Sequence, residues 1–173
     1  MIRLDGLTKK FGEREAVRSL SLEIARGEVF GLLGPNGAGK TTTISMVIGT
    51  LPPTSGDVHI DGKSLVDDPS LRRRVGVAPQ ALALYEDLTA RENLSFFGGL
   101  YGLNGRALNA AVDGALEMVG LRDRAGDRSK TFSGGMQRRL NLAAALVHGP
   151  DVLLLDEPTA GVDPQSRNSI IEL

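Results

Sequence analysis

The sequence has 173 residues, 41% of them hydrophobic, with 20 basic and 21 acidic side chains and a formal net charge of -1. This length fits one domain, or one domain with a subdomain, and the balanced charge and pI of about 6.1 argue against direct nucleic-acid binding. The lack of cysteine excludes disulfides and thiolate metal sites, and no apolar segment approaches the ~18 residues of a membrane span, so we expect any membrane role to come through a partner.

The first half of the chain predicts strands that alternate with a helix, which is the pattern of an α/β fold with a parallel sheet. We expect a helix at 41–48 and strands at 19–24, 29–33, 57–60 and 75–78. The segment 29–33 (VFGLL) is continuously apolar and predicts a buried strand. Asp61-Gly62 predicts a hairpin turn, so antiparallel strands should flank the parallel core.

The region between 88 and 150 predicts helices instead. Thr89 and Glu92 form a capping box that starts a helix of about 12 residues. Apolar residues then recur at helical spacing over 108–119, and Gly120 is placed to end that helix. A third helix is expected at about 134–147.

The segment Val152 to Leu155 (VLLL) has the apolar character of a central parallel strand covered on both faces. We therefore expect an α/β core formed by residues 1–80 and 150–173. Residues 81–149 are expected to form a helical subdomain inserted into that core.

A glycine-rich loop, GPNGAGKTT, lies between the predicted strand 29–33 and the predicted helix 41–48. It fits G-x-x-x-x-G-K-[ST], and the strand–loop–helix context predicts a phosphate-binding P-loop, in which backbone N–H groups curl around an anion. A glycine-rich turn that merely caps a helix is the alternative. The P-loop interpretation assigns phosphate contacts to Gly34, Pro35, Asn36, Gly37, Ala38, Gly39, Lys40, Thr41 and Thr42. Lys40 would reach the β- and γ-phosphates, and the Thr41 hydroxyl would bind Mg²⁺.

Two acids follow the VLLL strand. Asp156 is placed to hold magnesium, normally through water, and Glu157 is placed to polarise a water at the γ-phosphate. An acidic turn or helix cap is the alternative reading. A GTPase would be expected to show an N-K-x-D guanine reader, and the sequence contains none.

The stretch FSGGMQ at 132–137, followed by RRLNLAAAL and VLLLDEPTAGVDP, resembles the nucleotide-binding subunit of an ABC transporter. The resemblance covers essentially the whole chain. It implies a RecA-like P-loop NTPase core with a mixed sheet, flanking antiparallel strands and an inserted helical subdomain. The chain looks most similar to prokaryotic ABC-2-type exporter ATPases, judging by LYEDLTARENL and FSGGMQRRL.

The resemblance also implies roles for residues outside the P-loop. Ser133 can cap a helix while Gly134 and Gly135 leave its first N–H groups bare, which makes a second anion site for the ATP of the opposite subunit. Gln80 matches the glutamine that meets Mg²⁺ and links nucleotide state to the membrane subunit. Phe11 matches the aromatic residue that stacks on adenine, although a packing role is the alternative.

Further expectations concern Asp163, which precedes Pro164 and matches either a helix N-cap or an aspartate at the dimer interface. The family's switch histidine lies beyond the end of this sequence, and we expect His59 and His148 to be structural or solvated. The chain is thus expected to be truncated, and to bind ATP more firmly than it hydrolyses it.

The expected partners are ATP, a transmembrane permease and a second ATP-binding subunit in a head-to-tail dimer, with no direct nucleic-acid contact. The N-terminal residues lack the apolar stretch of a secretion signal, and the family works at the inner face of the cell membrane, so a cytoplasmic peripheral location is expected. Two alternatives remain at this point. One is a non-transport ABC ATPase associated with nucleic acid or ribosomes, and the other is an ATP-binding fragment that does not hydrolyse.

Overall fold

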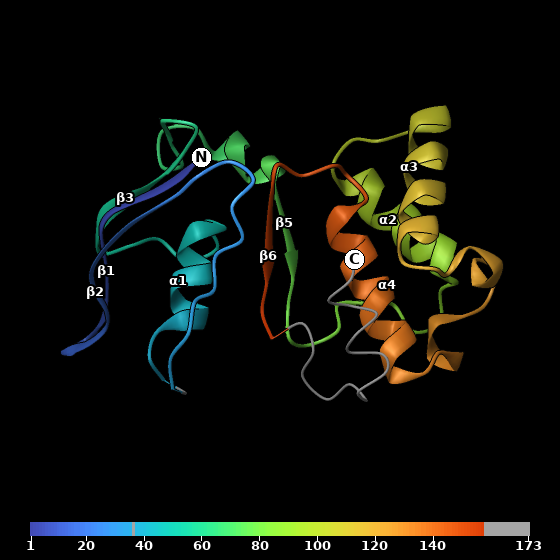
Figure 1. Ribbon diagram of the computed structural model, residues 1–173, viewed down its shortest axis with the longest axis horizontal. Coiled ribbons are helices and arrows are strands. Elements are labelled where there is room, and N and C mark those ends of the chain that lie inside the picture. The colour runs from blue at the N-terminus through green and yellow to red at the C-terminus, as the bar shows by residue number, and fades with distance from the viewer. Residues whose placement is uncertain (36, 158–173) are drawn as a thin grey trace. The chain divides into compact units, whose positions relative to one another are not determined.

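The computed structural model describes residues 1–35 and 37–157, drawn in colour in Figure 1. The chain divides into two compact units, an N-terminal unit, Met1–Arg72, and a C-terminal unit, Arg73–Leu173. No helix in these two described ranges is long and apolar enough to cross a membrane.

The N-terminal unit combines an antiparallel sheet with one helix. Its four strands pair in the order β2-β1-β3-β4, and helix α1 follows the glycine-rich loop. The elements are β1 (Ile2–Phe11), β2 (Arg14–Ile24), α1 (Lys40–Val47), β3 (Ser55–Ile60) and β4 (Lys63–Ser64). The predicted strands 19–24 and 57–60 lie in β2 and β3, and both of these strands pair antiparallel with β1, which confirms the predicted antiparallel strands.

The turn between β3 and β4 forms at Asp61-Gly62, as the sequence predicts. Both residues have left-handed φ values, 48° and 77°, and the strands pair through Ile60 and Lys63. Such a two-residue turn matches the twist of the strands that it joins, because both of its central residues have positive φ.

The predicted strand at 29–33 is wrong. In the described part of the chain, no strand pairs with this segment, and Val29 and Leu33 are 99% and 92% exposed. Apolar composition alone cannot define a strand, because a strand also needs a neighbour that completes its backbone hydrogen bonds. The segment therefore enters the glycine-rich loop without regular structure.

The C-terminal unit contains a pair of parallel strands and three helices that pack together, as Figure 1 shows. The strands are β5 (Val75–Ala78) and β6 (Val152–Leu155), and the helices are α2 (Ala90–Leu100), α3 (Gly105–Met118) and α4 (Gly134–Leu146). Among the described residues there are also three short 3-10 helices: η1 (Pro69–Arg74) precedes β5, and η2 (Arg122–Arg124) and η3 (Ser129–Thr131) lie between α3 and α4.

The predicted capping box at the start of α2 is present. The Thr89 side chain accepts a hydrogen bond from the Glu92 N–H at 3.1 Å, and the Glu92 carboxylate accepts one from the Thr89 N–H at 2.8 Å. The predicted stripe on α3 also packs into the core that α2 and α4 share, where Val112 and Leu116 are fully buried. Gly120, with φ 63°, follows the end of α3 as expected.

The strand β6 has the predicted bounds and pairs in parallel with β5 over all four residues. Its predicted cover on both faces is not observed, because Leu153 and Leu155 are 36% and 39% exposed whereas Val152 is buried. Among the described residues, only one neighbouring strand pairs with β6, so the continuous apolar run does not distinguish a central strand from an edge strand.

Candidate functional site

The glycine-rich loop ends where α1 begins. Gly39 precedes the helix with φ 87° and ψ 7°, and a Cβ at this position would lie 2.4 Å from the Ala16 carbonyl oxygen. Glycine is therefore needed here for both its left-handed backbone and its close approach to β2. Gly37 also has a left-handed φ, 82°, so the loop turns sharply just before the helix.

The first turn of α1 has no side-chain cap and contains no acidic residue. Its N–H groups and the positive end of the helix dipole are thus available to an anion, as a P-loop requires. Lys40 folds back over the loop, and its Nζ donates hydrogen bonds to the carbonyls of Gly34 at 2.7 Å and Pro35 at 3.0 Å. This places its charge at the loop that is expected to hold phosphates.

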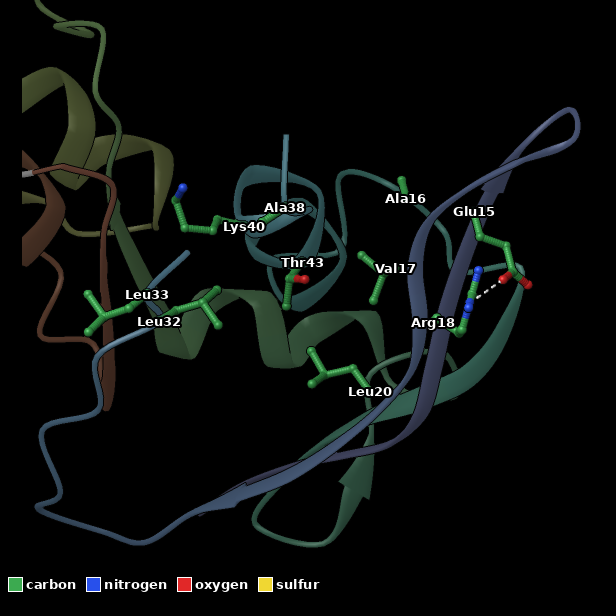
Figure 2. Close-up of a pocket in the computed structure, with 10 residues that line it drawn as sticks. All are labelled: Glu15, Ala16, Val17, Arg18, Leu20, Leu32, Leu33, Ala38, Lys40 and Thr43. Carbon is green, nitrogen blue, oxygen red and sulfur yellow. Dashed lines mark hydrogen bonds and ion pairs between the residues drawn. The ribbon is translucent and has the colours of Figure 1, made fainter. Parts of the chain in front are cut away.

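A cavity of about 450 Å³ lies beside this helix start. Figure 2 shows Lys40 and Thr43 of α1, Leu32 and Leu33 of the preceding segment, and side chains of β2 around it. The lining combines apolar surface with the charged side chains of Lys40, Arg18 and Glu15, and Arg18 pairs with Glu15 at 2.6 Å. Phe11 does not line this cavity, but its ring is 52% exposed and Lys9 Nζ lies 5.4 Å from its centroid.

The carboxyl ends of β5 and β6 bring the other predicted residues together. Gln80 follows β5 and Glu157 follows β6, and the Gln80 amide nitrogen donates a hydrogen bond to a Glu157 carboxylate oxygen at 3.1 Å. The Asp156 N–H donates to the Ala78 carbonyl at 3.0 Å, which continues the parallel ladder to the acids. Glu157 then leaves the strand with a left-handed φ of 49°.

Sequence reasoning missed Arg138, which lies behind this pair. It is on α4, it is 5% exposed, and it donates hydrogen bonds to backbone carbonyls that follow both β5 and β6. A weak signal was available, because an arginine within the otherwise buried face of a helix needs polar partners. The sequence could not show which carbonyls those partners are.

The start of α4 carries the predicted cap. The Ser133 hydroxyl accepts a hydrogen bond from the Met136 N–H at 3.3 Å. In the described ranges no acceptor is recorded for the N–H groups of Gly134 and Gly135, so these two donors remain available to an anion. Phe132, the first residue of FSGGM, is buried in the helical core, which explains an aromatic residue at that position.

The predicted site residues fall into two sets. Phe11 and the glycine-rich loop lie in the N-terminal unit, whereas Gln80, Asp156, Glu157 and residues 133–135 lie in the C-terminal unit. Within the second set, the structure joins Gln80 to Glu157 through a hydrogen bond. Asn36 and Asp163 lie outside the described residues.

The predicted magnesium ligands lie in different units, Thr41 in the N-terminal one and Gln80 and Asp156 in the C-terminal one, and their binding of magnesium stays a prediction. The predicted ligands are the Thr41 hydroxyl, the Gln80 amide oxygen and the Asp156 carboxylate, all of which are oxygen donors of the kind that Mg²⁺ prefers. Within residues 1–35 and 37–157 no group of three or more His, Cys, Asp or Glu side chains gathers into a metal cluster. Magnesium bound mainly through substrate phosphates needs only one or two carboxylates from the protein.

Each of the two histidines has neighbours within its own unit. His59 is between the carboxylates of Asp5 and Asp57 on the antiparallel sheet, at 3.5 and 3.7 Å. His148 stacks on Tyr101 with ring centroids 3.6 Å apart, and burial lowers its pKa, an effect that the nearby Val75 backbone opposes in part. That both histidines are structural or solvated stays a prediction.

Comparison with known proteins identifies the family. The sequence profile of the family described as ABC transporter matches residues 17–160. The linearmycin resistance ATP-binding protein LnrL of Bacillus subtilis (strain 168) is 48% identical, over 99% of this chain and 56% of its own length. A Nod factor export ATP-binding protein I of Paraburkholderia xenovorans (strain LB400) is 47% identical, over 99% of this chain and 57% of its own. The chain thus spans little more than half the length of these relatives.

Two solved structures share the fold. A structure described as the ATP binding subunit of an ABC transporter matches 99% of this chain and 72% of its own with a TM-score of 0.85 and 30% identity. The dimeric post-hydrolysis state of the ATP-binding cassette MJ0796, bound to ADP and Pi, matches 99% and 80% with a TM-score of 0.86 and 30% identity.

The glycine-rich helix start and the paired acids at the end of a parallel strand define an α/β protein of the P-loop NTPase class, as the sequence predicts. Within that class, the chain belongs to the ABC transporter family.

Proposed function

We propose that this chain is the ATP-binding part of an ABC exporter, which couples ATP binding and hydrolysis to export of a substrate through a separate permease. The observation that carries the proposal is the start of α1, where a glycine-rich loop, an uncapped first turn and Lys40 meet. The names of the two relatives, which refer to linearmycin resistance and to Nod factor export, support the exporter subtype.

The proposal divides the work between the two sets of site residues. Residues 34–42 hold the phosphates of ATP and Phe11 stacks on its adenine ring. Thr41, Gln80 and Asp156 hold Mg²⁺, which neutralises charge on the phosphates. The core is formed by 1–80 and 150–173, and the helical subdomain by 81–149.

Glu157 positions and polarises the attacking water in this scheme. The water oxygen forms a bond to the γ-phosphorus, the bond from that phosphorus to the bridging oxygen of ADP breaks, and the water proton passes to the carboxylate. Lys40 stabilises the charge that develops on the phosphate oxygens. The hydrogen bond from Gln80 to Glu157 supports this role, since it holds the carboxylate beside the glutamine that is expected to meet Mg²⁺.

A second copy of the chain completes each site in this proposal. Ser133, Gly134 and Gly135 contact the ATP that is held by the P-loop of the opposite subunit, and two subunits sandwich two ATP molecules head to tail. The free N–H groups at the start of α4 support this role. The dimeric form of the related cassette MJ0796 also supports it.

The permease is proposed to dock near the loop that follows Gln80. An exposed aromatic pair lies there, with Tyr85 and Phe96 51% and 41% exposed and their ring centroids 4.9 Å apart. Exposed apolar patches of this kind mark interaction surfaces. Docking there would keep the protein at the inner face of the cell membrane and connect it to the nucleotide through Gln80.

Replacement of the proposed water-positioning carboxylate by an uncharged amide of the same shape tests the function. In the full-length polypeptide that carries this sequence, Glu157→Gln should retain ATP binding within about threefold and lose hydrolysis by about 100-fold or more, because only the general base is removed. Equilibrium binding of a fluorescent ATP analogue and release of phosphate measure the two effects.

The matched control is Asp123→Asn, which makes the same change of charge at an exposed position on η2. Its hydrolysis rate should stay within about twofold of the unmutated protein. Unchanged hydrolysis by Glu157→Gln would refute the proposed role of Glu157.

A further inference from the structure

The guanidinium of Arg138 connects the ends of the two parallel strands. One terminal nitrogen, Nη1, donates to the carbonyls of Pro79 at 2.9 Å and Gln80 at 2.7 Å, both of which follow β5. The other, Nη2, donates to the carbonyls of Asp156 at 3.1 Å and Glu157 at 2.5 Å, which follow β6. Each nitrogen thus serves one strand.

This arrangement is internal to the C-terminal unit and shielded from water. Arg138 is 5% exposed, and burial lowers the pKa of its guanidinium while the Asp156 and Glu157 carboxylates oppose that shift. An arginine remains charged under such conditions, so its hydrogen bonds are charge-assisted and strong. One helical turn further along α4, Asn141 also binds the loop after β5, through the Pro79 carbonyl and the Ala83 N–H.

The four carbonyls belong to the peptides that carry the proposed catalytic pair. Gln80 and Glu157 hydrogen-bond to each other through their side chains, yet they are 77 positions apart in the sequence and lie on different strands. Glu157 also has a left-handed φ of 49°, a conformation that a non-glycine residue keeps only when its surroundings hold it. The hydrogen bond from Arg138 to the Glu157 carbonyl is such a constraint.

We propose that Arg138 is a positioning residue for ATP hydrolysis, which holds Gln80 and Glu157 in register from behind and ties their geometry to helix α4. The inference rests on the proposed role of Glu157. Because α4 begins at Ser133, a movement of that helix start is transmitted along one rigid element to the catalytic carboxylate.

The fork of an arginine is required for this task. Its two terminal nitrogens lie in one plane and can bind two separate carbonyl pairs at once, whereas the single ammonium of a lysine can serve only one strand end. Arg138→Lys therefore keeps the charge and most of the length and removes the connection between β5 and β6.

The neighbouring arginine supplies a matched control. Arg139 also lies on α4 and also donates from Nη1 to a backbone carbonyl, that of Val119 at 2.7 Å, which is far in sequence from either strand end. Arg138→Lys and Arg139→Lys thus remove the same chemical group from the same helix. Only the first change affects the proposed catalytic pair.

The two variants should separate in the steady-state ATPase kinetics of the full-length polypeptide. Arg138→Lys is expected to lower kcat about tenfold or more and to change KM for ATP by less than about threefold, because it disturbs the carboxylate without touching the phosphate loop. Arg139→Lys should keep both parameters within about twofold. A kcat within about twofold for Arg138→Lys, or an equal loss in both variants, would overturn the proposal.

A double-mutant cycle shows whether Arg138 acts through the pair. In a Glu157→Gln background, the carboxylate through which Arg138 is proposed to act is already replaced, so Arg138→Lys should lower the residual kcat by less than about threefold. A further loss of about tenfold there would overturn the proposed route. If Arg138→Lys unfolds at the assay temperature, Arg138→Gln, which keeps a donor for one strand end, enters the same comparisons.

The same measurement on Glu157→Gln distinguishes a failure of the positioning role of Arg138 from a failure of the proposed function. If Glu157→Gln lacks hydrolysis and Arg138→Lys is fully active, the proposed function stands and the positioning role is wrong. If Glu157→Gln retains hydrolysis, the role of Glu157 fails and the positioning role fails with it.

Discussion

The starts of helices α1 and α2 are built in opposite ways. At α2, Thr89 and Glu92 satisfy each other's backbone N–H groups, so the helix start is closed. At α1, Gly39 offers no side chain and the first turn contains no acid, so the helix start is open. Both helices are short, but only α1 follows a glycine-rich loop with a lysine folded over it.

This difference in capping distinguishes a helix start that only stabilises the fold from one that can bind an anion. A capped start has used its donors and contributes to stability, whereas an open start leaves donors and a positive dipole for a ligand. The start of α4 is intermediate, since Ser133 caps one N–H while those of Gly134 and Gly135 have no recorded acceptor in the described ranges. A substitution at the open start of α1 should therefore lower the affinity for ATP, whereas a substitution at the closed start of α2 should lower the free energy of unfolding.

The largest effect is expected at the open start. Lys40→Ala removes the cation at the start of α1, whose Nζ donates hydrogen bonds to the Gly34 and Pro35 carbonyls. It should weaken ATP binding by about 100-fold or more, because a charge-assisted contact with the phosphates is lost. Isothermal titration with a non-hydrolysable ATP analogue measures this change.

Lys63→Ala is the control, since Lys63 is an exposed lysine on β4 of the same unit and does not line the cavity. Its affinity for the analogue should stay within about twofold of the unmutated value. Equal affinities for the two variants would show that the open helix start is not the phosphate site.

The smaller effect is expected at the closed start. Thr89→Ala removes the side-chain cap of α2 and should lower the free energy of unfolding by about 1 kcal/mol. ATP affinity should not change, because the closed start has no ligand. Urea unfolding followed by circular dichroism gives the stability, and Ser95→Ala, a hydroxyl deletion inside the same helix, should cost less than about 0.5 kcal/mol. If Thr89→Ala lowers the affinity for ATP, the start of α2 is not purely structural and the proposed difference between the two helix starts is wrong.

Local signals made both helix starts predictable. The capping box at Thr89 and the G-x-x-x-x-G-K-T pattern ending at Thr41 each lie within a few residues, and the chemistry that they require is local. The hairpin turn at Asp61-Gly62 and the bounds of β6 were also predicted for local reasons.

Features that depend on distant partners were not predictable. The segment 29–33 has the composition of a strand, but a ladder needs a neighbour that the segment itself does not specify. Likewise, nothing in the stretch QRRLNL shows that Arg138 will meet carbonyls 58 and 59 positions earlier in the chain. The family resemblance supplied the role of Gln80, and only the structure showed its hydrogen bond to Glu157.

The most direct test of the central claim is an amide NMR titration with a non-hydrolysable ATP analogue and magnesium. If the open helix start binds the triphosphate, the N–H signals of residues 37–42 should shift strongly, because those groups become hydrogen-bond donors to phosphate oxygens. The N–H signals of residues 90–92, at the closed start of α2, should stay in place. Unshifted signals at 37–42, or equal shifts at both helix starts, would contradict the account.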